Sequence, residues 1–222
     1  MQITGIILAG GENLRMGKNK AFLEVNGQRI IHRTGNLFLE LFDEVLLVTN
    51  SPLDYLDLNL RMVADLYPGK GALGGIYTGI FHASHAHAFV AACDMPFLNK
   101  ALIDHLIDLS PGYDIVIPKT EDGLQPLHAI YSQKCLPFME DLLRKNNLKI
   151  LDFFHRVKKR EVPTEEILPL DPKLASFLNL NTPEDIARAK EYLGPVRDTL
   201  NIAKQTLKPS PPPSPPPPEG EG

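Results

Sequence analysis

Short runs of consecutive apolar residues recur along the first half of the chain, and each is followed by polar or glycine-rich residues. Runs of this length, rich in β-branched side chains, are typical of strands buried on both faces of a sheet. We therefore predict buried strands over residues 3–9, 45–49, 60–64 and 88–92, a short strand over 22–25, and further strands over 113–118 and 124–131.

Between these runs, apolar residues recur at the three-to-four-residue spacing of amphipathic helices. This spacing predicts helices over residues 30–42, 76–81, 100–109, 135–144 and 148–156. A last helix is expected to open at Thr182, which is a good N-cap, with Pro183 at its first position. The alternation of strands and helices predicts an α/β fold with a mostly parallel sheet and helices on both faces.

The composition fits one domain of ordinary size followed by a different kind of segment. The chain has 222 residues, of which 43% are hydrophobic and 23% charged, as in globular proteins with a substantial core. Residues 208–222 consist almost entirely of Pro, Ser, Gly and Glu, which cannot build a core. We predict one domain over residues 1–195 and a Pro-rich, disordered tail over 196–222.

Charge and cysteine content narrow the function further. The formal net charge of −4 argues against nucleic acid as the main partner. Cys93 and Cys135 lie far apart without metal-ligand spacing, which favours reduced thiols. The sequence shows neither a signal-peptide pattern nor an apolar run of membrane-spanning length. We therefore expect a cytoplasmic protein without a membrane partner.

The loop after the first strand combines glycines with positive charges. Gly10, Gly11 and Gly17 allow backbone N–H groups to approach phosphate oxygens, and Arg15 and Lys20 can balance the phosphate charge. A Walker A loop fits poorly, because five residues separate Gly11 from Gly17 where that motif needs four. A Gly-x-Gly-x-x-Gly fingerprint is absent from the loop as well.

Asp94 stands at the predicted carboxyl end of the strand over 88–92, where open α/β sheets bind ligands. Nucleotidyl transfer needs a divalent cation to offset the charge on the phosphate oxygens. Mg²⁺ keeps most of its waters, so one or two carboxylates suffice to hold it. Asp94 is therefore a candidate Mg²⁺ ligand, and the alternative is a buried structural carboxylate.

A series of motifs, taken in order, resembles the molybdenum cofactor guanylyltransferases, the MobA family. The motifs are Leu8-Ala9-Gly10-Gly11, Arg15-Met16-Gly17, Lys20, Asp65, Gly71-Ala72-Leu73-Gly74-Gly75, Cys93-Asp94-Met95-Pro96 and Asn179-Leu180-Asn181-Thr182-Pro183. The likeness covers residues 3–193 and implies a single Rossmann-like three-layer domain. It also implies transfer of GMP from GTP to the phosphate of molybdopterin, with release of pyrophosphate.

The resemblance also implies roles for individual residues. Catalysis would fall to Arg15, Lys20 and Asp94, and Asp94 would bind Mg²⁺. The nucleotide and acceptor would be bound by Leu8, Ala9, Gly10, Gly11, Lys20, Asp65, Asp94 and Asn181. Asn179 and Asn181 are our candidates for the pterin end, because amides both donate and accept hydrogen bonds, and the alternative for Asn181 is a residue that only precedes the helix cap. The asparagine that the family carries after its second strand is not in register, since Val48 occupies that position and Asn50 follows two residues on. Which residues read the base and which the ribose is therefore left open.

Two other functions remain possible beside the expected partners GTP and molybdopterin. One is a CTP-dependent molybdopterin cytidylyltransferase or another small-acceptor nucleotidyltransferase. The other is a non-catalytic nucleotide-binding adaptor in molybdoenzyme maturation, against which the set of Arg15, Lys20 and Asp94 speaks. Beside GTP and molybdopterin, transient contact with molybdoenzyme maturation proteins is a further expected interaction. His128 is a candidate for the acceptor side, but we interpret it as a core or surface histidine. The histidines within residues 82–87 could suggest a metal site, but they lack a partner carboxylate or cysteine in the sequence, and we interpret them as a solvated helix end.

Overall fold

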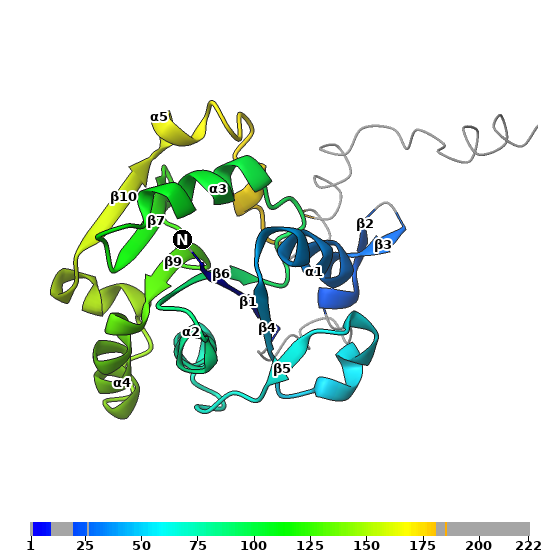
Figure 1. Cartoon of the computed structure of the whole chain (residues 1–222), viewed down its shortest axis with the longest axis horizontal. Coiled ribbons are helices and arrows are strands. Elements are labelled where there is room, and N and C mark those ends of the chain that lie inside the picture. Colours follow the sequence, from blue (N-terminus) through cyan, green and yellow to red (C-terminus); the bar gives the residue numbers. More distant parts are fainter. Residues whose placement is uncertain (1, 10–19, 26, 181–184, 186–222) are drawn as a thin grey trace, which may run out of the picture.

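The computed structural model describes residues 2–9, 20–25, 27–180 and 185. A twisted sheet with the strand order β10-β7-β9-β6-β1-β4-β5 runs through its centre, and β8 pairs with β7 at one side (Figure 1). The strands are β1 (Thr4–Leu8), β4 (Glu44–Val48), β5 (Arg61–Val63), β6 (His87–Ala92), β7 (Ile115–Thr120), β8 (Gly123–Leu124), β9 (His128–Ser132) and β10 (Lys159–Pro163). A separate hairpin joins β2 (Glu24–Val25) to β3 (Gln28–Arg29).

Most neighbouring strands run parallel. β1 pairs in parallel with both β4 and β6, β4 pairs in parallel with β5, and β7 with β10. β9 runs antiparallel to β6 and β7, and the short β8 runs antiparallel to β7. The predicted mostly parallel sheet is confirmed, with one reversed strand inserted between β6 and β7.

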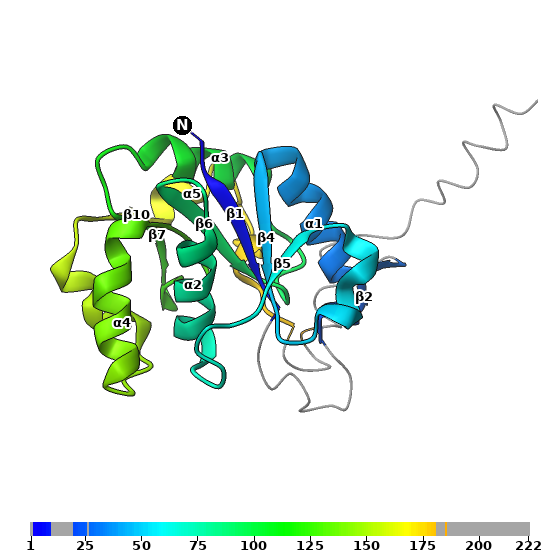
Figure 2. The ribbon, with the colours of Figure 1, turned by 60° about the horizontal axis from the view of Figure 1, so that its bottom comes forward.

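Helices cover both faces of this sheet, which confirms the three-layer α/β architecture (Figure 2). α1 (Ile30–Leu41) and α3 (Lys100–Leu109) lie on one face, whereas α2 (Gly71–His82) and α4 (Leu136–Arg144) lie on the other (Figure 1). The shorter helices are α5 (Thr164–Ile167) and the 3₁₀ turns η1 (Lys20–Phe22), η2 (Pro52–Leu58), η3 (Gln133–Cys135), η4 (Ile150–Arg156) and η5 (Ala175–Phe177).

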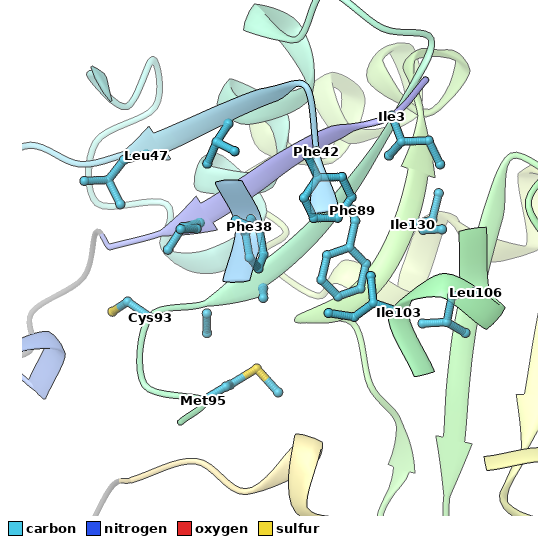
Figure 3. Close-up of a cluster of buried hydrophobic side chains, with 14 of the residues drawn as sticks. Ile3, Phe38, Phe42, Leu47, Phe89, Cys93, Met95, Ile103, Leu106 and Ile130 are labelled. Carbon is cyan, nitrogen blue, oxygen red and sulfur yellow. The ribbon is translucent and has the colours of Figure 1, made fainter. Parts of the chain in front are cut away.

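Each face of the sheet has its own apolar core. Under α1 and α3, the ring of Phe89 on β6 stacks on Phe42 with centroids 5.9 Å apart, and Phe38 lies 5.8 Å from Phe89 (Figure 3). Under α2 and α4, the core centres on Ile6 and Tyr131, both fully buried. Because β1 and β6 contribute to both cores, their side chains are buried on both faces, as their continuous apolar runs predict.

Several predicted boundaries and one predicted helix type were wrong. The single strand over 124–131 is divided into β8 and β9, because Pro126 lacks an N–H and a turn forms there with His128 N donating to Gln125 O at 3.0 Å. The helix expected over 76–81 begins five residues earlier, at Gly71. The segment over 148–156 forms the 3₁₀ turn η4 rather than an α-helix.

The C-terminal predictions concern residues that the structure does not describe. The expected helix at Thr182 and the tail over 196–222 fall outside the described ranges, so both stay predictions. Among the described helices, none has the length and apolar character that crossing a bilayer requires.

Candidate functional site

Three parallel strands end side by side at one edge of the sheet. Leu8, the last residue of β1, lies opposite Val48 of β4 and Ala92 of β6. The hydrogen-bonded ladder continues past the strands, since Ala9 N donates to Val48 O at 2.9 Å and Cys93 N donates to Leu8 O at 3.0 Å. The residues that leave these strands therefore emerge together, at the edge where open α/β sheets bind ligands.

A cavity of about 210 Å³ opens at this edge. Its described lining is Leu8, Val48, Asp65, Gly71, Ala72, Gly75, Ala92, Cys93, Asp94 and Leu127. Three of the residues that the sequence singles out, Leu8, Asp65 and Asp94, thus meet around one space although they come from three different strands. Ala9 follows directly and is buried. Apolar walls with two carboxylates suit a ligand that is held by shape and by a few polar contacts.

Helix α2 reaches this cavity because glycines let it lie directly on β1. A Cβ on Gly79 would come within 2.6 Å of Ile6, and one on Gly75 within 3.3 Å of Leu8. With this close approach, Gly71 and Ala72 in the first turn of the helix border the cavity. The N–H groups of a first helical turn carry partial positive charge, which favours an anionic or hydrogen-bond-accepting ligand.

Asp65 leaves β5 and is held by three hydrogen bonds. Its backbone N–H donates to Asn50 Oδ1 at 3.0 Å. Its Oδ1 accepts from Tyr67 N at 2.9 Å and from the Thr78 hydroxyl at 2.9 Å. No pattern in the sequence indicates that Thr78 is involved, because it lies in the buried part of α2 and meets Asp65 only in the folded chain. Asn50 is partly indicated by the sequence, because the family resemblance implies an asparagine after the second strand, although Asn50 lies two residues beyond that position.

Asp94 lies in the turn after β6, and the end of the described chain runs beside it. Leu180 N donates to Asp94 O at 3.1 Å, and the Leu180 side chain is buried against Ile30 at the start of α1. The preceding residue, Asn179, has a buried Oδ1 without a hydrogen-bond partner among the described residues. The Asp94 residue is half-buried at the cavity, and because Mg²⁺ keeps most of its waters, such a carboxylate suits it as a ligand.

The remaining sequence-predicted site residues cannot be placed. Gly10, Gly11, Arg15 and Asn181 lie outside the described residues, and for Lys20 only the backbone is described, at the start of η1. Their roles therefore stay predictions. The next described element along the chain is η1, which lies next to α1.

His128 is a core residue, which agrees with its interpretation from the sequence. It is fully buried between the rings of Phe89 and Phe177, whose centroids each lie 5.1 Å away. Neither ring nitrogen has a hydrogen-bond partner within the described part of the chain. Burial lowers the pKa of His128 to about 3, so the ring is neutral at physiological pH.

Both cysteines are buried, and two of the remaining histidines, His85 and His87, join separate elements of the fold. Burial raises the pKa of Cys135 to about 12, which keeps that thiol protonated. Nδ1 of His85 lies 3.0 Å from the Thr4 hydroxyl, and Nε2 of His87 lies 3.0 Å from Tyr113 O. The expected solvated helix end is therefore wrong for these two histidines, whose partly buried rings join separate elements.

The fold and the site define a class of protein. A mostly parallel sheet between helices, with carboxylates and a helix N-terminus meeting beyond the carboxyl ends of its central strands, is the architecture of the Rossmann-like nucleotidyltransferases. Within this class, residues 5–159 match the family model of the MobA-like NTP transferase domain. The chain belongs to this family.

Known relatives align with nearly the whole domain. The molybdenum cofactor guanylyltransferase of Desulfosudis oleivorans is 38% identical over 190 residues, covering 85% of this chain and 94% of that protein. A probable molybdenum cofactor guanylyltransferase of Pelotomaculum thermopropionicum is 39% identical, covering 86% and 93%. Among solved structures, molybdopterin-guanine dinucleotide biosynthesis protein A of Archaeoglobus fulgidus superposes with a TM-score of 0.73 at 28% identity, covering 86% of this chain and 98% of that one.

Proposed function

We infer that this protein transfers GMP from GTP to the phosphate of molybdopterin, forming the guanine dinucleotide cofactor and releasing pyrophosphate. The observation that carries this conclusion is the meeting of Leu8, Asp65 and Asp94 around one cavity at the carboxyl edge of the sheet. Relatives named as molybdenum cofactor guanylyltransferases align with 85% and 86% of this chain.

Nucleotidyl transfer requires the protein to position two phosphate groups and to offset their charge. A terminal phosphate oxygen of the acceptor attacks the α-phosphorus of GTP in line. One P–O bond forms, and the bond to the leaving pyrophosphate breaks. No protein nucleophile is needed, which is consistent with the two buried cysteines. Arg15 and Lys20 are proposed to bind the phosphates of GTP.

Mg²⁺ is the proposed cofactor, and Asp94 would hold it. When bound, the cation would supply positive charge to the phosphate oxygens during transfer. Asn179 directly precedes Leu180, which is bonded to the Asp94 turn, and its buried Oδ1 lacks a partner among the described residues, so it would be able to accept a hydrogen bond from the acceptor. We place the pterin end of the acceptor near Asn179 and Asn181.

Asp65 is proposed to contact the nucleoside part of GTP, since it lines the cavity together with the first turn of α2. Leu8, Ala9, Gly10 and Gly11 would line the nucleotide along the end of β1. A cytoplasmic location and transient contact with molybdoenzyme maturation proteins stay predictions from the sequence.

Pyrophosphate release tests this function directly. The purified protein is incubated with Mg²⁺, molybdopterin and either GTP or CTP, and reactions without molybdopterin serve as controls. We expect acceptor-dependent pyrophosphate release with GTP and far less with CTP. Preference for CTP would identify a cytidylyltransferase. Tight GTP binding without pyrophosphate release from either nucleotide would instead identify a non-catalytic adaptor.

A further inference from the structure

We propose that Thr78 is a positioning residue that fixes the carboxylate of Asp65, so that only one of its oxygens is available to the nucleotide. The proposal rests on the function inferred above, in which Asp65 contacts the nucleoside. Thr78 does not line the cavity itself. It lies in the buried part of α2 and acts through Asp65.

The hydrogen bonds of the Thr78 hydroxyl determine where its proton points. The hydroxyl oxygen accepts from Leu66 N at 3.0 Å and lies 2.9 Å from Asp65 Oδ1. A hydroxyl has a single proton to donate, and a carboxylate oxygen can only accept. The Thr78 proton therefore points at Oδ1. Thr78 is fully buried, so water does not compete for this bond.

The same oxygen also accepts from Tyr67 N at 2.9 Å, so two donors occupy Oδ1. Asn50 holds the other side of the residue, because its Oδ1 accepts from the backbone N–H of Asp65 at 3.0 Å. Gly74 of α2 packs closely against this carboxylate, since a Cβ on Gly74 would lie 2.9 Å from Tyr67 O and 3.4 Å from Asp65 Oδ1. The segments that follow β4 and β5 and the buried face of α2 are thereby joined around one carboxylate.

This arrangement limits what Asp65 can bind. With Oδ1 occupied by two donors, Oδ2 is the oxygen left for a ligand, and no described residue donates to it. The paired N–H donors of a guanine edge are bound best when both carboxylate oxygens accept. One oxygen suits a single donor, such as a sugar hydroxyl. Asp65 therefore makes one hydrogen bond to the nucleotide rather than a bidentate contact with the base.

Calorimetric titration of GTP in the presence of Mg²⁺ tests the proposal with the variants Thr78→Val, Thr78→Ser, Asp65→Asn and the double variant Thr78→Val with Asp65→Asn. Thr78→Val should raise the Kd for GTP about tenfold, the effect of roughly one well-placed hydrogen bond. Thr78→Ser retains the hydroxyl and should restore binding. The double variant should bind no more weakly than Asp65→Asn alone, because Thr78 acts only through that carboxylate.

Thr34→Val is the matched control, since Thr34 is also a buried helical threonine but lies in α1, away from this cavity. It should bind GTP like the unaltered protein. Thermal unfolding is followed for every variant, because Thr78→Val also removes the acceptor for Leu66 N. A purely structural role would lower the melting temperature of Thr78→Val and leave the Kd unchanged, and that result would overturn the proposal. Additive losses in the double variant would overturn it as well.

Two further measurements keep the proposal separate from the proposed function. Asn50→Ala changes an exposed residue, so it should fold and still weaken GTP binding; if Thr78→Val does not fold, unchanged binding by Asn50→Ala overturns the proposal. ITP lacks the 2-amino donor of GTP, so Asp65→Asn should weaken ITP and GTP binding equally. A larger loss for GTP would show a bidentate base contact. If Asp65→Asn binds GTP normally, the nucleotide site itself is misplaced, whatever Thr78 does.

Discussion

The backbone N–H of Leu180 donates a 3.1 Å hydrogen bond to the backbone carbonyl oxygen of Asp94. This bond joins the end of the described chain to the turn that follows β6. On the other side, Cys93 N donates to Leu8 O at 3.0 Å, so backbone bonds hold the turn from two directions. These main-chain contacts help to set the position of Asp94, and they do not involve its carboxylate.

Asp94→Asn should therefore lower turnover by about a thousandfold or more while the fold is retained, since metal-borne charge supplies several kcal/mol to the transition state. The amide has the same shape but lacks the charge that retains Mg²⁺. Turnover measured against Mg²⁺ concentration checks this, with circular dichroism as the fold control. Asp122→Asn, at an exposed carboxylate in the β7–β8 turn, should behave like the unaltered protein. A folded Asp94→Asn protein with near-normal turnover would show that the metal is held elsewhere.

Lys20→Ala provides a contrast within the same assay. Lys20 is proposed to bind the phosphates in both the ground state and the transition state, so its loss should weaken GTP binding and turnover together. Excess Mg²⁺ should partly restore turnover in Asp94→Asn and leave Lys20→Ala unchanged. Equal rescue of both variants would contradict the separate roles of these residues.

GTP with Mg²⁺ should stabilise the protein more than CTP, UTP or ATP does. A ligand present at a hundred times its Kd adds about 2.7 kcal/mol to the free energy of unfolding. The shift in melting temperature with each nucleotide, at equal concentration, measures this preference. Omitting Mg²⁺ should reduce the GTP effect if Asp94 holds the cation beside the phosphates. A larger shift with CTP would place the protein among the cytidylyltransferases.

The sequence predicted the site residues that lie at strand ends. It missed the residue that reaches the site only through a tertiary contact. Leu8 ends one continuous apolar run and Asp94 follows another, and such runs become parallel central strands whose carboxyl ends share one edge. Thr78 was missed because its bond to Asp65 joins a helix to a strand end, and no spacing in the sequence records that bond. A helical threonine facing the core has the same local pattern whether or not its hydroxyl reaches a site.

The edge strand β10 is absent from the strands predicted from the sequence, and the explanation is similar. β10 (Lys159–Pro163) carries charged residues and ends in proline, a pattern without the apolar run of a buried strand. It forms because β7 offers a parallel edge, with Val162 buried beside Pro118. The reversed direction of β9 was equally invisible, since apolar runs give the same signal in parallel and antiparallel strands.

Glu44 lies at the edge of the sheet opposite the cavity, and it should make the stability of the protein depend on pH. Burial alone would raise the pKa of Glu44, but hydrogen bonds from Thr4 at 2.7 Å and Ser84 at 2.8 Å, together with the Arg61 guanidinium, outweigh it and lower the pKa. A lowered folded-state pKa contributes stability that is present above the unfolded-state pKa and lost as the pH falls through the folded value.

Glu44→Gln should therefore lower the free energy of unfolding at pH 7 by about 1–3 kcal/mol, the cost of weakening a charged, partly buried hydrogen-bond network. Its stability should also fall less steeply than that of the unaltered protein between pH 5 and pH 3. Urea unfolding across this range measures both effects, and Glu121→Gln, at an exposed carboxylate, is the control. Parallel pH profiles for Glu44→Gln and the unaltered protein would contradict the assignment.

His128 should produce a second pH dependence, at higher pH and with a separate cause. Its folded-state pKa is lowered to about 3 by burial, whereas an unfolded histidine titrates near 6.5. Between these values the unfolded chain binds a proton that the folded protein excludes, so stability falls as the pH falls, by about 1.4 kcal/mol per pH unit. The unaltered protein should lose about 2 kcal/mol from this residue between pH 7 and pH 5.

His128→Leu should remove this loss. At pH 7 the variant should be at least as stable as the unaltered protein, because it replaces two buried ring nitrogens that lack partners among the described residues with apolar atoms next to Phe89 and Phe177. Urea unfolding at both pH values checks the difference, and His155→Gln, at an exposed histidine, should leave the pH dependence unchanged. If His128→Leu loses as much stability on acidification as the unaltered protein, the buried ring has found a proton acceptor or water in solution, and it is not the neutral core residue inferred here.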